Sequence, residues 1–148
     1  MTHRNDLIDN LTTALNLIDG SGAFTFSLET VERFTFNPIS EPLMPLAFIH
    51  EGKEFYDDQS QGQMTRRLQV TIEAWADADG AVENLSERAG LLLADLERAA
   101  AIDSTLGDEA LDTKLVSGET WAGDGGNRVG CALELELIYR TTRKNPNA

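Results

Sequence analysis

One stretch of the sequence, Asp79–Ala101 (DGAVENLSERAGLLLADLERAAA), has the residue pattern of a long amphipathic helix. Its aliphatic side chains recur at intervals of three and four residues, which places them on one side of a helix. They are Val82, Leu85, Ala89, Leu92, Leu93 and Leu96. Asp79 precedes the first turn, where a carboxylate can accept hydrogen bonds from the free backbone amides. The pattern predicts a helix over about residues 80–101.

This helix needs a partner to be stable. Burying each large aliphatic side chain contributes roughly 1.5–3 kcal/mol. Fixing the backbone costs about 1–2 kcal/mol of conformational entropy for every residue in the helix. The apolar side of the helix is therefore expected to lie on a large, flat apolar surface.

The segments on either side of the helix predict that surface. Before it, Arg66–Ala76 (RRLQVTIEAWA) alternates apolar and polar residues, as a strand with one buried face does. After it, Thr113–Ala122 and Arg128–Thr142 read as a hairpin that turns through Gly123–Asn127. The carboxyl-terminal half is thus predicted to be a strand, a helix and a hairpin, with the helix covering the sheet.

The amino-terminal half has a similar mixture of elements. Asn5–Ile18 is predicted to be a helix, and Gly20 and Gly22 are its stop signals. Two short strands are expected within residues 23–36, an extended Pro-rich connector over 37–45, a strand over 46–51 and a mobile polar loop over 52–65. The prediction is one α+β domain over residues 1–148, with a mixed, mostly antiparallel sheet and both helices packed on it. Residues 143–148 are expected to be a frayed tail.

The composition limits the classes of function. The net charge is −13 and the isoelectric point is about 4.4, which argues against a protein that grips phosphate backbones. The acidity serves solubility, or it keeps nucleic acid from adhering. No apolar run is long enough to span a bilayer, and the first residues, MTHRNDLIDN, have no apolar signal-peptide core. The protein is therefore expected to stay in the cytoplasm of the cell that makes it.

The sequence contains no recognisable catalytic, cofactor or metal motif, and we expect none of these sites. His3 and His50 are the only histidines, and neither has a cysteine or carboxylate at ligand spacing. The single cysteine, Cys131, falls on the inferred core face of a strand, where an inert thiol is favoured over a nucleophile. The glycine-rich segment 123–127 leads into a strand and not into a helix, so it is interpreted as a hairpin turn and not as a phosphate loop.

Two features suggest assembly with other proteins. Trp75 lies on the polar face of its predicted strand, and Trp121 lies near the tip of the predicted hairpin. Exposed tryptophans often mark protein contacts, although a neighbouring loop or helix can also shield them. The second feature is the long polar loop after Gly52.

The order of elements resembles the tail terminator (minor tail, tail-completion) proteins of long-tailed bacteriophages. The resemblance rests on Arg66–Ala76 running into Asp79–Ala101 and on a closing strand that ends in Tyr139-Arg140-Thr141-Thr142 before Pro146. It implies a virion protein of the tail, made in the cytoplasm of the bacterial host, that forms a ring, typically a hexamer, on the head-facing end of the tail tube. The ring would stop tube polymerisation and join the head, with no catalysis and no cofactor. The implied partners are further copies of the chain, the tail tube protein and a head–tail connector or neck protein; DNA would pass through without specific binding, and no membrane is involved.

On this basis two sets of residues are candidates. The candidate assembly contacts are Asp57, Asp58, Gln59, Gln61, Arg67, Trp75 and Trp121. The candidate acidic face of the lumen consists of Glu73, Glu134 and Glu136, which are predicted to lie on the sheet face away from the long helix.

Three other functions remain open from the sequence. The nearest is another neck component, such as a head–tail connector or a head-completion protein. More distant alternatives are a small dimeric α+β enzyme with its site across the interface, and a cytoplasmic adaptor with an acidic surface.

Overall fold

The computed structural model describes residues 3–34, 43–58, 62–78, 84–107, 110–123 and 127–142. These residues form two helices and five strands. In chain order the elements are α1 (His3–Leu15), β1 (Thr30–Arg33), β2 (Leu46–Asp58), β3 (Gln63–Asp77), α2 (Leu85–Ile102), β4 (Asp112–Gly123) and β5 (Arg128–Thr142). The predicted α+β class is confirmed.

The strands form one five-stranded sheet in the order β1-β2-β3-β5-β4. Only β1 and β2 are parallel; the other neighbours are antiparallel. The two longest strands, β3 and β5, pair along their whole length, from Gln63 opposite Thr142 to Asp77 opposite Arg128. They form the centre of the sheet.

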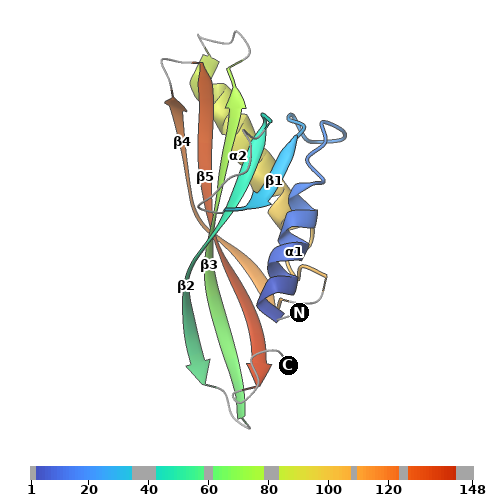
Figure 1. Ribbon diagram of the computed structural model, residues 1–148, viewed down its shortest axis with the longest axis vertical. Helices are drawn as coiled ribbons and strands as arrows, with labels where there is room; N and C mark the ends of the chain where they lie inside the picture. Colours follow the sequence, from blue (N-terminus) through green and yellow to red (C-terminus); the bar gives the residue numbers. More distant parts are fainter. Residues whose placement is uncertain are drawn as a thin grey trace.

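Both helices cover the same face of the sheet, and Figure 1 shows α2 running behind the upper half of the strands. The core lies between this covered face and the helices. On β3 it contains every second residue from Leu68 to Ala76, as the alternation predicted, and on β5 every second residue from Val129 to Tyr139. Leu92 and Leu96 of α2 and Leu7 and Leu11 of α1 complete it. Cys131 is buried in this core, as predicted.

The predicted helices differ from the observed ones at their ends. The helix α1 ends at Leu15, three residues before the predicted Ile18, and Gly20 and Gly22 follow with φ values of 80° and 61°. The helix α2 begins at Leu85, after Asn84, whereas the pattern placed its start near residue 80. The predicted cap, Asp79, lies outside the described residues.

The predicted polar loop at residues 52–65 is wrong over most of its length. Residues 52–58 belong to β2 and residues 63–65 to β3, and the two strands pair as far as Asp58 opposite Met64. The strand predicted over 46–51 is therefore only the first part of β2. Polar side chains fail to indicate a strand here because most of this hairpin extends beyond the helices, so neither of its faces must be apolar. We call the end of the sheet that lies beyond the helices, residues 55–58, 63–67 and 140–142, the extension; it lies at the bottom of Figure 1.

The two strands predicted within residues 23–36 are reduced to one. Thr30–Arg33 forms β1, while Phe26 is buried in a segment without regular structure that is joined to Asp19 by an isolated bridge at Ser27. Asp95 of α2 explains this conformation, because its buried carboxylate accepts hydrogen bonds from the backbone amides of Thr25 and Phe26 at 3.0 and 2.8 Å. The part of the Pro-rich connector before Leu43 lies outside the described residues.

Candidate assembly surfaces

The sheet face opposite the helices, which we call the open face, carries the three predicted acidic residues. Register places Glu134 beside Thr71 and Glu136 beside Gln69, with Glu73 two residues further along β3 from Thr71. All three side chains are half-buried. The prediction that they share the face away from α2 agrees with this register.

Each of these acids has a polar neighbour on an adjacent strand. Glu73 lies 3.2 Å from the Nε2 atom of His50. Glu134 accepts a hydrogen bond of 3.0 Å from the Ser117 hydroxyl, and Glu136 lies 3.6 Å from the Arg67 guanidinium. The open face is therefore a mixed face in which carboxylates alternate with hydroxyl, imidazole and guanidinium groups.

The two candidate tryptophans meet on the open face. Trp75 of β3 and Trp121 of β4 both stand opposite Gly130 of the intervening strand β5. Their rings pack edge to face, with centroids 5.3 Å apart. Both side chains are half-buried, because the two rings shield one another. They form a single aromatic patch at the end of the sheet away from the extension.

The extension carries the remaining candidate contacts. Asp57 accepts a hydrogen bond of 3.0 Å from Nε of Arg67, and the Arg67 guanidinium lies 5.1 Å from the ring centroid of Phe55. These side chains share the open face. Asp58 is the last residue of β2, while Gln59 and Gln61 lie outside the described residues.

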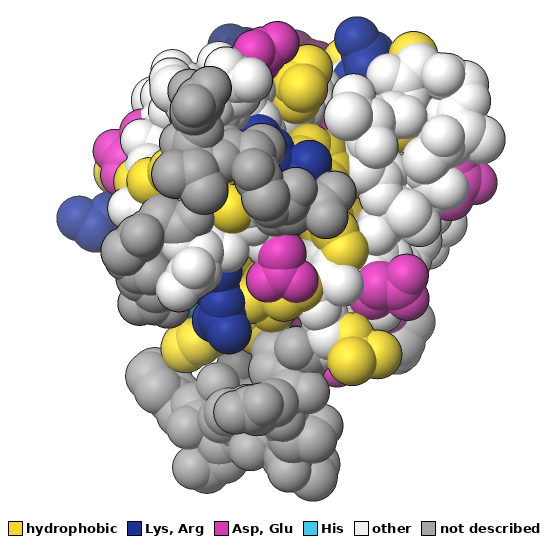
Figure 2. All heavy atoms as spheres, turned by 90° about the horizontal axis from the view of Figure 1, so that it is seen from above, with side chains coloured by type: hydrophobic (Ala, Val, Ile, Leu, Met, Phe, Trp, Pro, Cys, Tyr) yellow, Lys and Arg dark blue, Asp and Glu magenta, His cyan; other side chains and the backbone are white. Residues whose placement is uncertain are grey.

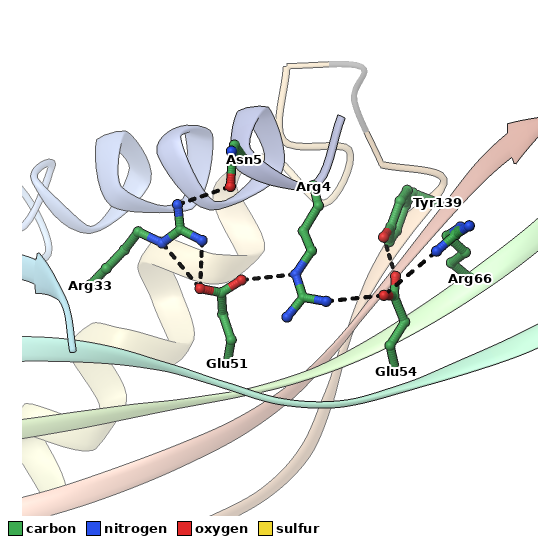
Figure 3. A network of polar contacts seen from close by, with 7 residues as sticks. All are labelled: Arg4, Asn5, Arg33, Glu51, Glu54, Arg66 and Tyr139. Atoms are coloured by element: carbon green, nitrogen blue, oxygen red, sulfur yellow. Dashed lines mark hydrogen bonds and ion pairs between the residues drawn. The ribbon is translucent and has the colours of Figure 1, made fainter. Parts of the chain in front are cut away.

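A network of ion pairs on the covered side ties α1 to β2, and the sequence analysis missed it (Figure 3). The Glu51 carboxylate lies 2.9 Å from Nε of Arg4 and 2.5 Å from a guanidinium nitrogen of Arg33. Arg33 also donates to the side-chain oxygen of Asn5 at 3.1 Å. Burial acts to raise the pKa of the Glu51 carboxyl, but its contacts with Arg33 and Arg4 outweigh burial and hold that pKa below its ordinary value.

The second half of this network is centred on Glu54. Its carboxylate accepts a hydrogen bond of 3.1 Å from Arg4 and lies 3.7 Å from Arg66. The Tyr139 hydroxyl donates to the same carboxylate. Burial raises the pKa of the Tyr139 phenol, and the hydrogen bond to Glu54 raises it further. No local pattern in the sequence indicates this cluster, because Arg4 and Tyr139 are separated from Glu54 by 50 and 85 residues.

The position of β4 at the edge of the sheet is a second feature that the sequence analysis missed. It pairs with β5 on one side only, and the described residues supply no strand for its other side. Its side chains from Lys114 to Thr120 are all exposed, including Leu115 and Val116. Between Leu115 and Ser117 the register shifts by one residue, so Val116 forms a bulge. The predicted hairpin included this strand but did not indicate that it would lie at an edge.

We searched the described residues for metal-ligand clusters, reactive thiols and activated hydroxyl groups. Within the described ranges no three His, Cys, Asp or Glu side chains are arranged to hold a metal ion. Burial raises the pKa of the Cys131 thiol to about 12, which suppresses the nucleophilic thiolate. Ser117 and Glu134 line a hollow of about 290 Å³ on the open face, whose other lining residues are Thr71, Gly118, Glu119 and Ala132. None of these six is a base of the kind that activates a serine in the familiar catalytic triads.

Two further observations concern the hydropathy of the helices and the side chains at one end of the molecule. Neither helix in the described part of the chain is both long and apolar enough to cross a membrane. Figure 2 looks at the end that is uppermost in Figure 1, and it shows acidic, basic and hydrophobic side chains interspersed there.

Comparison with known proteins gives a limited result. No protein family matches the sequence, and no curated protein matches it. Among solved structures, the chain is similar to a chain in the virion of a native gene transfer agent particle. That similarity covers 91% of this chain and 92% of the other, with 12% sequence identity and a TM-score of 0.43.

Proposed function

We propose that this protein is a structural component of a phage-like virion that forms a ring at the head-proximal end of the tail tube. The ring stops polymerisation of the tube and provides the surface to which the head is joined. The resemblance in sequence to tail terminator proteins motivates the proposal. In this role the chain performs no catalysis.

The observation that carries the proposal is that the helices leave one face of the sheet and the extension uncovered. The helices cover one face only, so the open face and the extension are left for other molecules. The open face carries the Trp75–Trp121 patch at one end and the Asp57–Arg67 pair at the other. Half-buried aromatic and arginine side chains of this kind are typical anchors of protein interfaces. Such a surface suits a subunit whose work is assembly.

The charge of the protein fits a ring through which DNA passes. The net charge is −13, and like charge discourages DNA from adhering to the wall of a channel. We assign Glu73, Glu134 and Glu136 to the side of the subunit that lines this channel. We assign the tip of the β2–β3 hairpin, Asp57–Gln63, to contact with the tail tube or a neighbouring subunit.

Binding to purified tail tubes tests this function. The expected result is that rings of this protein cap one end of each tube in electron micrographs, and that tubes grown with it stop at a defined length. Light scattering on a sizing column across a concentration series gives the mass of the free protein. A protein that binds the portal end of heads and not the tubes would instead be a connector or head-completion protein.

Deletion of residues 57–63 tests the role assigned to the hairpin tip. The core lies away from this tip, so the shortened chain is expected to fold but to leave tails of uncontrolled length. Tails that still end at the correct length and still join heads would show that the tip is dispensable.

A further inference from the structure

We propose that copies of this chain join edge to edge, with strand β4 of one copy pairing antiparallel with residues Lys53–Asp57 of β2 in the next copy. This inference deepens the proposed ring by naming the two surfaces that meet. It assigns one register: Lys114 opposite Asp57, Leu115 opposite Tyr56, and Glu119 opposite Lys53.

The first argument is that each copy has two free sheet edges. Strand β4 has a neighbour on one side only. At the opposite edge of the sheet, β1 pairs only with Leu46–Ile49 of β2. No described residue pairs with the outer edge of Lys53–Asp57. Free edges present unpaired backbone donors and acceptors, which another strand can satisfy. Because the two edges are different surfaces, their contact is heterologous, which is the type of contact that builds rings.

The second argument is the strand direction. Each of the pairs β2–β3, β3–β5 and β5–β4 is antiparallel, so β4 runs opposite to β2 within one sheet. A second copy that continues the sheet with the same orientation therefore brings its β2 to β4 in the antiparallel sense.

The third argument is that the charges on the two edges match in spacing. Lys114 and Glu119 are separated by four pairing steps, because Val116 between them is the extra residue of the bulge. Lys53 and Asp57 are also four residues apart. In the antiparallel sense both pairs of opposed residues then have opposite charges, whereas the parallel sense would oppose Lys114 to Lys53 and Glu119 to Asp57. Opposite charges directly across two strands are stabilising and like charges are destabilising.

The fourth argument is that the opposed side chains point to the same faces. Lys114 and Glu119 stand opposite Glu136 and Ala132, residues of the open face. On β2, Asp57 bonds Arg67 on that face, and the Lys53 ammonium lies 6.0 Å from the centroid of the Phe55 ring on it.

The apolar pair lies on the other side of the sheet. Leu115 stands opposite the core residue Leu135, and Tyr56 lies under the Arg66 guanidinium, 4.8 Å from it, on the covered side. In the separate subunit Leu115 is 50% exposed and Tyr56 is 59% exposed. The proposed register therefore places Leu115 of one copy against Tyr56 of the next, and each side chain would lose part of its exposed surface.

Cysteine cross-linking tests the register. The variant Lys53→Cys/Glu119→Cys places two thiols opposite one another, and Lys114→Cys/Asp57→Cys does the same four residues away. The matched control, Lys53→Cys/Lys114→Cys, places them about 13 Å apart along the strand, beyond the reach of a disulfide. Cys131 can stay in place because its buried thiol is inert.

The expected result is that mild oxidation converts both test variants into covalent multimers, while the control stays uncross-linked. A mixture of the single variants Lys53→Cys and Glu119→Cys is expected to give dimers only. Cross-linking of the control alone, or no cross-link in any variant up to the highest soluble concentration, would overturn the register. Dimers formed by Lys114→Cys/Glu119→Cys without larger species would show that β4 pairs with another β4, which also overturns the proposal.

A second measurement uses the uncross-linked protein. The variant Leu115→Lys/Val116→Lys puts two charges on the β4 edge and is expected to remain monomeric and folded under conditions where the unaltered chain forms rings. Ile102→Lys is the control, because Ile102 is 57% exposed, close to the 54% of Val116, and lies at the end of α2. Rings that form equally well from the edge variant would contradict edge pairing and leave the terminator role intact. Edge-paired assemblies that do not bind tail tubes would contradict the terminator role and leave edge pairing intact.

Discussion

Trp75 and Trp121 meet edge to face across β5, at an interplanar angle of 71°, because the residue between them is Gly130. A Cβ atom at position 130 would lie 2.5 Å from Nε1 of Trp121 and 3.0 Å from Cε3 of Trp75. The aromatic patch of the open face therefore depends on a residue without a side chain.

Replacing this glycine is expected to separate the two rings. Gly130→Ala forces the tryptophans to move, and overpacking of this kind costs about 1–3 kcal/mol of unfolding free energy. Urea unfolding measures the loss of stability, and near-ultraviolet circular dichroism reports the change in ring geometry.

Gly90→Ala is the matched control for that variant. A Cβ atom at Gly90, within α2, meets no atom within 4 Å. Alanine is favoured over glycine in a helix by about 0.5–1 kcal/mol, so this variant is expected to be more stable than the unaltered chain. An unchanged dichroism spectrum and unchanged stability in Gly130→Ala would show that the rings are not held as described.

The hydrogen bonds that join Asp95 of α2 to the segment after α1 give a second prediction. Asp95→Ala removes the buried acceptor of the Thr25 and Phe26 amides. Leaving such donors unsatisfied costs about 1–3 kcal/mol, so the unfolding free energy should fall by that amount. Asp95→Asn keeps one oxygen acceptor and is expected to lose less. Equal stabilities of the two variants in urea would contradict the hydrogen-bonding explanation.

A third prediction concerns acid stability. The Glu51 carboxyl has a lower pKa in the folded protein than its ordinary value because of Arg33 and Arg4. Its stabilising contribution is therefore full above the ordinary carboxyl pKa and is lost as the pH falls through the lower folded pKa. The stability difference between the unaltered chain and Glu51→Gln should shrink over this acidic range. Urea unfolding at a series of pH values measures it, and a difference that does not vary with pH would rule out this linkage.

A fourth prediction tests the acidic face in the assembled state. Glu134→Lys/Glu136→Lys is expected to leave the ring intact but to make it bind DNA, with an affinity that falls as salt increases. Asp9→Lys/Glu87→Lys makes the same change in net charge on the exposed side of the two helices, so it controls for charge alone. Fluorescence anisotropy with labelled DNA distinguishes them. DNA affinity that is equal in the two assembled variants would remove Glu134 and Glu136 from the channel wall.

The parts of the fold that could be predicted are those where one face must be buried. The alternation from Leu68 to Ala76 correctly identified the covered side of β3, because that strand lies beneath the helices and every second residue enters the core. The same reasoning failed for residues 52–58, since most of them are exposed and the side chain of Glu54, which is buried, is a carboxylate, so no apolar period marks the strand.

In the candidate site, too, some features could be predicted from the local residue pattern and others could not. That Glu73, Glu134 and Glu136 share a face followed from the period of two, which register preserves across strands. The contact between Trp75 and Trp121 did not follow, because it requires the strand order β3-β5-β4. The Arg4–Glu51 and Glu54–Tyr139 contacts are likewise set by the tertiary arrangement, since they join residues that lie 47 and 85 positions apart in the chain.

The position of β5 has a consequence for when the protein becomes able to assemble. This strand is the last in chain order, yet it lies between β3 and β4 in the sheet. While the ribosome is still making β5, β3 lacks its longest partner and β4 has no neighbour at all. The β4 edge that is proposed to join copies therefore takes its place in the sheet only after synthesis of β5. On the proposed edge pairing, a chain can enter a ring only after this strand has been made.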